Sequence, residues 1–128
     1  MALTALLGAK IHDGTVMHEG KALVHGNGVL TGILAQDQLP DDYAISHLDG
    51  GVITPGFVDL QVNGAGGVMF NDDPSVETLV TMSDALASVG TCAFLPTLIT
   101  DTFEHSRAAI EAAISAIKQG VSGVIGLH

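Results

Sequence analysis

Residues Gly50 to Gly67 read GGVITPGFVDLQVNGAGG, and this stretch decides the fold because a short apolar run lies in it between two turn signals. We expect Phe57 to Val62 to form a strand. Side chains alternate along a strand, so Asp59, Gln61 and Asn63 would share one face and the apolar side chains the other. The sequence therefore predicts that polar groups converge at the C-terminal end of this strand.

From residue 53 onward, strand patterns alternate with helical patterns. We expect a first helix to begin after Ser75, which can cap its N-terminus, and to end at Gly90. The second strand is expected at 91–95, a second helix at about 102–118 and a third strand at 124–127. The apolar side of the second helix is predicted to consist of Phe103, Ala109, Ile110, Ala113, Ile114 and Ile117. Such alternation is typical of an α/β fold with a parallel sheet.

The first part of the chain has a different pattern. Up to Gly50, short apolar clusters are separated by turn signals, which predicts a small antiparallel β unit. Asn27-Gly28 is typical of a tight hairpin, and Pro40 begins a turn before a strand at 43–48. We therefore expect two domains, at residues 1–52 and 53–128.

Composition limits the classes of partner. The chain has 14 acidic and 4 basic residues and a formal charge of -10, which argues against nucleic acid or an anionic membrane as a partner. The single Cys92 excludes an internal disulfide and suits a reducing compartment. The N-terminus lacks the pattern of a signal peptide, so a cytoplasmic location is expected.

The first predicted strand carries a recognisable pattern. In the amidohydrolase superfamily this strand typically reads Pro-Gly-x-x-Asp-x-His-x-His, and the two histidines bind metal. This sequence has Pro55, Gly56 and Asp59 but Gln61 and Asn63 in place of the histidines. Amides are poor zinc ligands compared with neutral imidazole, so half of the usual two-metal site is absent.

Three further segments strengthen this pattern: NGAGGVMFND at 63–72, FLPTLIT at 94–100 and the closing GVIGLH. Together with the strand, they make the chain resemble the N-acetylglucosamine-6-phosphate deacetylase family. The resemblance implies the N-terminal portion of a (β/α)8 TIM barrel preceded by a small β-sandwich region, both incomplete here. A TIM barrel typically takes about 250 residues, so 128 cannot close one.

The resemblance also implies a reaction. The family hydrolyses the acetamide of N-acetylglucosamine 6-phosphate, using one divalent metal, most often zinc, held by a glutamate and two histidines. An aspartate serves as the general base. The family continues Gly-Leu-His-x-Glu-Gly-Pro where this sequence ends at His128, so these residues are expected outside the chain. The chain alone is therefore predicted to be inactive and to bind no metal tightly, and the complete enzyme to be a homodimer.

Four residues are the candidates for the site. Gln61, Asn63 and His128 are expected to line the pocket near the substrate and a metal-bound water, because strand ends form the mouth of a barrel. Asp59 either hydrogen-bonds loop amides or takes part in the chemistry, and we expect it to lie behind the pocket residues. Asn71 and Asp72 are expected to cap the first helix. No catalytic residue or metal ligand is assigned within the chain.

Two alternatives stay open at this stage. A different amidohydrolase would share the β unit and the first strand, although Gln61 and Asn63 argue against it. A non-catalytic scaffold or binding module would keep the fold without the chemistry. The remaining histidines lack metal-ligand spacing and are expected to be solvated surface residues: His12, His18, His25, His47 and His105.

Overall fold

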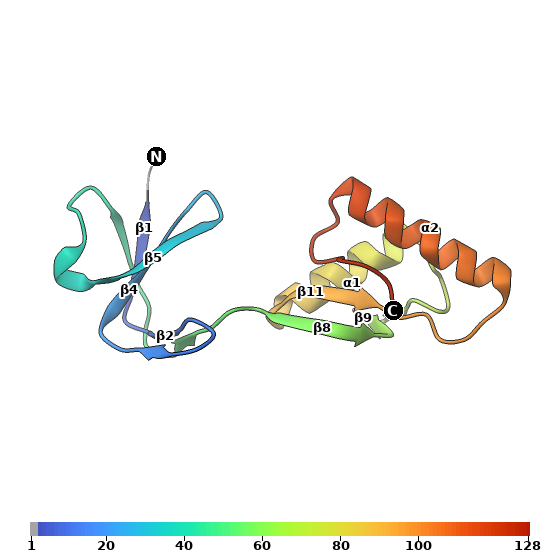
Figure 1. Ribbon diagram of the computed structural model, residues 1–128, viewed down its shortest axis with the longest axis horizontal. Helices are drawn as coiled ribbons and strands as arrows, with labels where there is room; N and C mark the ends of the chain where they lie inside the picture. Colours follow the sequence, from blue (N-terminus) through green and yellow to red (C-terminus); the bar gives the residue numbers. More distant parts are fainter. Residues whose placement is uncertain (1–2) are drawn as a thin grey trace. The chain divides into compact units, whose positions relative to one another are not determined.

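A computed structural model describes residues 3–128, which form two compact units that divide between Pro55 and Gly56. The first unit contains only strands and one short 3-10 helix, whereas the second contains two α-helices (Figure 1). The elements of the first unit are β1 (Thr4–Leu7), β2 (Lys10–His12), β3 (Met17–His18), β4 (Lys21–Gly26), β5 (Val29–Ala35), η1 (Gln36–Gln38), β6 (Ala44–His47) and β7 (Val52–Ile53).

The strands of the first unit form two sheets, in the orders β5-β4-β1-β6 and β3-β2-β7. The expectation of an antiparallel unit is only partly right, because β1 pairs with β6 and β2 pairs with β7 in parallel. Parallel neighbours cannot be joined by a tight turn. The connection through η1 and the turn at Pro40 instead carries the chain across the sheet, where the Tyr43 N–H donates to the Pro40 carbonyl.

The core of this sheet is small. Its fully or nearly buried members are Ala5, Leu7, Ala22 and Val24. The predicted hairpin at Asn27-Gly28 is confirmed: it joins β4 to β5, and both residues have a positive φ, of 52° and 76°. Such a pair suits the right-handed twist of an antiparallel hairpin.

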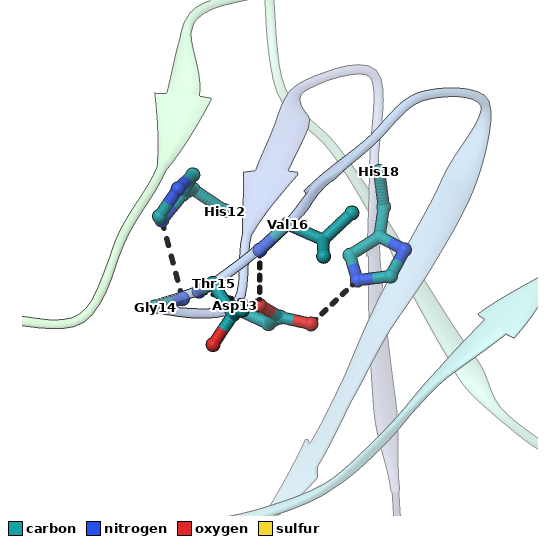
Figure 2. Close-up of polar contacts among 6 residues, drawn as sticks. All are labelled: His12, Asp13, Gly14, Thr15, Val16 and His18. Carbon is teal, nitrogen blue, oxygen red and sulfur yellow. Dashed lines mark hydrogen bonds and ion pairs between the residues drawn. The ribbon is translucent and has the colours of Figure 1, made fainter.

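Asp13 organises the turn between β2 and β3 (Figure 2). One carboxylate oxygen accepts the N–H groups of Thr15 and Val16, both at 2.8 Å, and the other lies 2.8 Å from His18 Nε2. The hydrogen bond with His18 is the main cause that lowers the pKa of Asp13. His12 Nδ1 accepts the Gly14 N–H, so both histidines are partly exposed surface residues that also form local hydrogen bonds.

The second unit contains β8 (Phe57–Val62), β9 (Gly64–Ala65), β10 (Val68–Met69), α1 (Val76–Ser88), β11 (Thr91–Pro96) and α2 (Phe103–Gln119). Strands β8 and β11 pair in parallel, as the alternation of strands and helices predicted. Both helix starts are confirmed, since Ser75 accepts the Thr78 N–H and Thr102 accepts the His105 N–H. Gly120 ends α2 in the left-handed conformation, at a φ of 74°.

The third strand expected at 124–127 is not formed. The structure has a single parallel bridge between Phe94 and Val124, although the segment follows β11 through further backbone hydrogen bonds. Phe94 donates to Gly123 and Ile125 donates to Phe94, after which the ladder stops at Pro96. Proline has no N–H to continue it, and the next bond, from His128 to the Pro96 carbonyl, is out of register.

Helix α2 turns a different face to the core from the one expected. Its buried residues are Ala109, Ala112, Ala113 and Ala116, whereas Phe103, Ile110, Ile114 and Ile117 are exposed. The prediction was right for two alanines and wrong for the larger side chains. Alanines allow α2 to pack closely against Phe94 and the α1 residues Leu79 and Met82, in one core cluster. A helix with two apolar stripes does not reveal from its sequence which of them is buried.

Candidate functional site

The candidate site lies at the C-terminal ends of β8 and β11, where the last residues of the chain also lie. Gln61 and Asn63 come from the end of β8, and His128 follows the segment along β11. His128 Nδ1 lies 3.0 Å from the carbonyl oxygen of Leu60, the residue before Gln61. Figure 1 shows the C-terminus beside β9, at this end of the unit. The structure thus brings the imidazole of His128 to the backbone of β8 beside Gln61.

Asp59 and Gln61 are both exposed on β8. The carboxylate of Asp59 accepts the backbone N–H of Gln61 at 3.1 Å. This bond corresponds to the structural alternative for Asp59, in which a carboxylate holds nearby amides. The other face of β8 differs from the simple expectation, since Val62 is buried but Val58 and Leu60 are exposed. The described residues cover that face only at Val62, which belongs to the core cluster of this unit.

Asn63 has an unusual environment. Its backbone carbonyl accepts the Phe70 N–H at 2.8 Å, but its side-chain Oδ1 is buried and has no hydrogen-bond partner among residues 3–128. A buried acceptor without a partner typically costs about 1–3 kcal/mol. A donor from a ligand, from water or from another part of the protein would remove that cost. Of the candidate residues, Asn63 therefore has the clearest unused bonding capacity.

The glycine-rich stretch after Asn63 forms a hairpin. Strands β9 and β10 are antiparallel and are joined by Gly66-Gly67, with φ values of 66° and 83°. Gly64 is required for another reason, because a Cβ there would collide with the backbone carbonyl of Val68. The glycines thus allow a tight turn directly after Asn63.

Asn71 has a role that sequence reasoning missed. We expected it to cap α1, together with Asp72, but the cap is Ser75, and Asp73 accepts the hydroxyl groups of Ser75 and Thr78. Asn71 instead reaches the loop before α2, where its Oδ1 accepts the Ile99 N–H at 2.8 Å. These partners are 28 residues apart, so no local pattern could have revealed the contact.

The histidines and the basic residues lie in other settings. Nε2 of His105 is 2.6 Å from the carbonyl oxygen of Asn71, so His105 is half-buried and less solvated than expected. Lys10 pairs with Glu19 at 2.6 Å and lowers the pKa of that carboxyl. Arg107 pairs with Glu111 at 2.8 Å, which raises the pKa of Arg107. Two of the four basic residues are thus engaged by acidic partners outside the candidate site.

The described residues do not fit a metal site. Residues 3–128 contain no cluster of three or more histidine, cysteine, aspartate or glutamate side chains suited to hold an ion. The side chains at the strand ends are the two amides of Gln61 and Asn63, with one imidazole from His128. Amide oxygens are weak ligands for zinc. A metal in the complete protein would need other residues.

Comparisons with known proteins identify the protein family to which the chain belongs. No protein-family model matches the chain. It is 39% identical over 123 residues to an N-acetylgalactosamine-6-phosphate deacetylase of Shewanella sp. and 34% identical over 113 residues to an N-acetylglucosamine-6-phosphate deacetylase of Haemophilus influenzae. These alignments cover 94% and 88% of this chain. The chain is homologous to the N-terminal part of these sugar-phosphate deacetylases.

The fold agrees with this family. A crystal structure of N-acetylglucosamine-6-phosphate deacetylase from Pasteurella multocida matches 91% of the chain, at 37% identity and a TM-score of 0.86. The chain is shorter than the deacetylases, since it spans 31% and 29% of the two curated relatives and 31% of the crystal structure. No helix within residues 3–128 is both long and apolar enough to cross a membrane.

Proposed function

We propose that this chain supplies the N-terminal part of a deacetylase that hydrolyses the acetamide of N-acetylglucosamine 6-phosphate to glucosamine 6-phosphate and acetate. The similarity to curated deacetylases over almost the whole chain carries this proposal. The convergence of Gln61, Asn63 and His128 at one end of parallel strands supports it. Such an enzyme would act in amino-sugar breakdown, in the cytoplasm and as a homodimer, without a nucleic-acid or membrane partner.

The two units suggest known domain types. Residues 53–128 would be the first βαβαβ units of a TIM barrel, which the parallel pairing of β8 with β11 and the flanking helices support. Residues 1–52 would be part of a β-sandwich, which the two small sheets support. Both domains would be completed by chain beyond this segment.

The candidate residues would act on the substrate as neutral groups. The amides of Gln61 and Asn63 can donate to and accept from an acetamide or a sugar hydroxyl without adding charge. Asn63 Oδ1 is a buried acceptor without a partner among the described residues. His128 would line the same pocket, and Asp59 would hold the backbone of Gln61 in place. The divalent metal of the family, which we expect to be zinc at one ion per site, would be held by other residues.

A second sugar phosphate is also supported as a candidate substrate. The Shewanella relative, at 39% identity, is named for N-acetylgalactosamine 6-phosphate. The two sugars differ only in the orientation of the C4 hydroxyl group. A hydrogen bond to that hydroxyl would therefore decide which sugar is preferred.

Turnover of both sugar phosphates by the complete protein tests the proposal. We expect acetate release from at least one of them, and none from the isolated 128-residue chain. Gln61→Ala and Asn63→Ala should each lower kcat/KM by about tenfold or more, which corresponds to the loss of about one hydrogen bond of 1.4 kcal/mol. The exposed residue Gln119, at the end of α2, gives a matched control in Gln119→Ala. Failure of the complete, metal-loaded protein to hydrolyse either sugar would contradict the proposal.

A further inference from the structure

Two loops leave the C-terminal ends of the strands in the second unit, and Asn71 joins them. The first runs from Asn63 to α1 and the second from β11 to α2. Asn71 lies in the first loop, directly after the buried Phe70. Its side chain contacts the exposed part of the second loop, at Ile99 and Asp101. The contacts cross 28 and 30 residues of sequence.

Each polar group of Asn71 in this contact faces a complementary partner. Oδ1 accepts the Ile99 N–H at 2.8 Å, and Nδ2 lies 3.4 Å from both the Ile99 carbonyl oxygen and Asp101 Oδ2. The orientation of the amide follows from this chemistry, since its oxygen faces a donor and its nitrogen faces two acceptors. The backbone carbonyl of Asn71 lies 2.6 Å from His105 Nε2, which anchors Asn71 to the first turn of α2.

The second loop is bound at its other end to the candidate pocket. The Thr97 N–H donates to the carbonyl of Val62, which lies between Gln61 and Asn63, at 2.8 Å. The Leu98 N–H donates to the carbonyl of His128 at 3.0 Å. The base of the loop is thus held by the backbone beside the pocket residues. Beyond Leu98 the loop is exposed, and there it is held by Asn71.

We propose that Asn71 is a positioning residue, which fixes the loop at 97–102 over the mouth of the site so that the loop is already ordered when the sugar phosphate binds. This inference rests on the proposed function for the identity of the ligand. A loop that is ordered in advance loses no conformational freedom on binding, so more of the interaction energy appears as affinity. Release of the loop would weaken the binding of the substrate and of the transition state to the same extent, so KM would rise and kcat would not change.

The first test is Asn71→Ala in the complete protein, with acetate release and amide hydrogen exchange measured on the same samples. We expect KM to rise by about tenfold while kcat changes by less than about twofold. The Ile99 amide, which loses its acceptor, should exchange at least about tenfold faster. The matched control is Asp72→Ala in the same loop, because that side chain is exposed and takes part in no hydrogen bond within the described residues.

A charge swap provides the rescue. Asn71→Asp keeps the acceptor for Ile99 but turns a carboxylate oxygen toward Asp101 Oδ2, so KM should rise. Adding Asp101→Asn restores a donor opposite an acceptor, and it keeps an oxygen for the Thr102 N–H. The double variant should have a clearly lower KM than Asn71→Asp, although not the wild-type value, because the new carboxylate still lies opposite the Ile99 carbonyl oxygen. Asp101→Asn alone should not lower KM. A double variant with the same KM as Asn71→Asp would overturn the pairing.

Three further outcomes would also decide whether Asn71 positions the loop. A purely structural role would reduce the active fraction, which lowers kcat per total protein and leaves KM unchanged, and that result would overturn the proposal. Unchanged exchange at Ile99 in Asn71→Ala would overturn it as well. If the wild-type protein hydrolyses neither sugar, the proposed function fails, and exchange at Ile99 alone then decides whether Asn71 holds the loop.

Discussion

Strands β8 and β11 are parallel neighbours, yet their side chains are buried to very different degrees. On β11, Phe94 is 1% exposed, and the strand is hydrogen-bonded to β8 on one edge and to the last residues of the chain on the other. On β8, Phe57 is 67% exposed and Leu60 is 62% exposed. Strand β8 pairs only with β11 in the described residues. Apolar content therefore does not determine burial, which depends on the elements that cover a strand.

The difference has a functional meaning. The largely exposed strand β8 carries Gln61 and leads to Asn63, whereas β11, in which Phe94 and Pro96 are buried, carries none of the candidate site residues. An apolar strand with an open edge and uncovered side chains is an association hazard in water. In the proposed deacetylase, β8 would be covered by chain that lies outside this segment.

The largest expected effect comes from matched phenylalanine truncations on the two strands. In this chain, Phe94→Ala should lower the free energy of unfolding by about 3–5 kcal/mol, because it leaves a cavity in the core. Phe57→Ala should cost less than about 0.5 kcal/mol, because the side chain is already in water. Urea unfolding followed by circular dichroism measures both. Equal losses would show that β8 is covered in solution, and the comparison would fail.

A second substitution tests the same strand in two proteins, because β8 is exposed in this chain and would be covered in the complete deacetylase. Leu60→Ala should cost less than about 0.5 kcal/mol in this chain. In the complete deacetylase it should cost about 2–4 kcal/mol, if the barrel closes over this strand. Thermal or urea unfolding of the variant in both proteins gives the two values. A small loss in the complete protein would argue that β8 stays uncovered there.

The smallest effect concerns α1, which packs against β11. Ser75→Ala removes the side chain that accepts the Thr78 N–H, and it should cost about 1 kcal/mol. The matched control is Ser88→Ala at the other end of the helix, where the hydroxyl only bonds a carbonyl of the preceding turn. That control should be neutral or slightly stabilising. Loss of exchange protection confined to the first turn of α1 would support the cap, and loss along all of β8 would contradict it.

Local patterns predicted much of the second unit. Ser75, Thr102 and Gly120 act within a few residues of themselves, so the helix ends could be read from the sequence. In the first unit, the hairpin at Asn27-Gly28 was predictable for the same reason. The buried face of α2 could not be predicted, because its isoleucines are more hydrophobic than the alanines that are in fact buried.

The candidate site shows the same division. The period-two pattern of β8 was enough to single out Asp59, Gln61 and Asn63, and similarity in sequence was enough to relate the chain to the sugar-phosphate deacetylases. The tertiary structure alone brought Asn71 to Ile99 and His128 to Leu60, because these contacts join residues far apart in the chain. Short-range hydrogen bonds and side-chain periodicity are properties of a segment, whereas burial and long-range contacts depend on what the rest of the chain places against it.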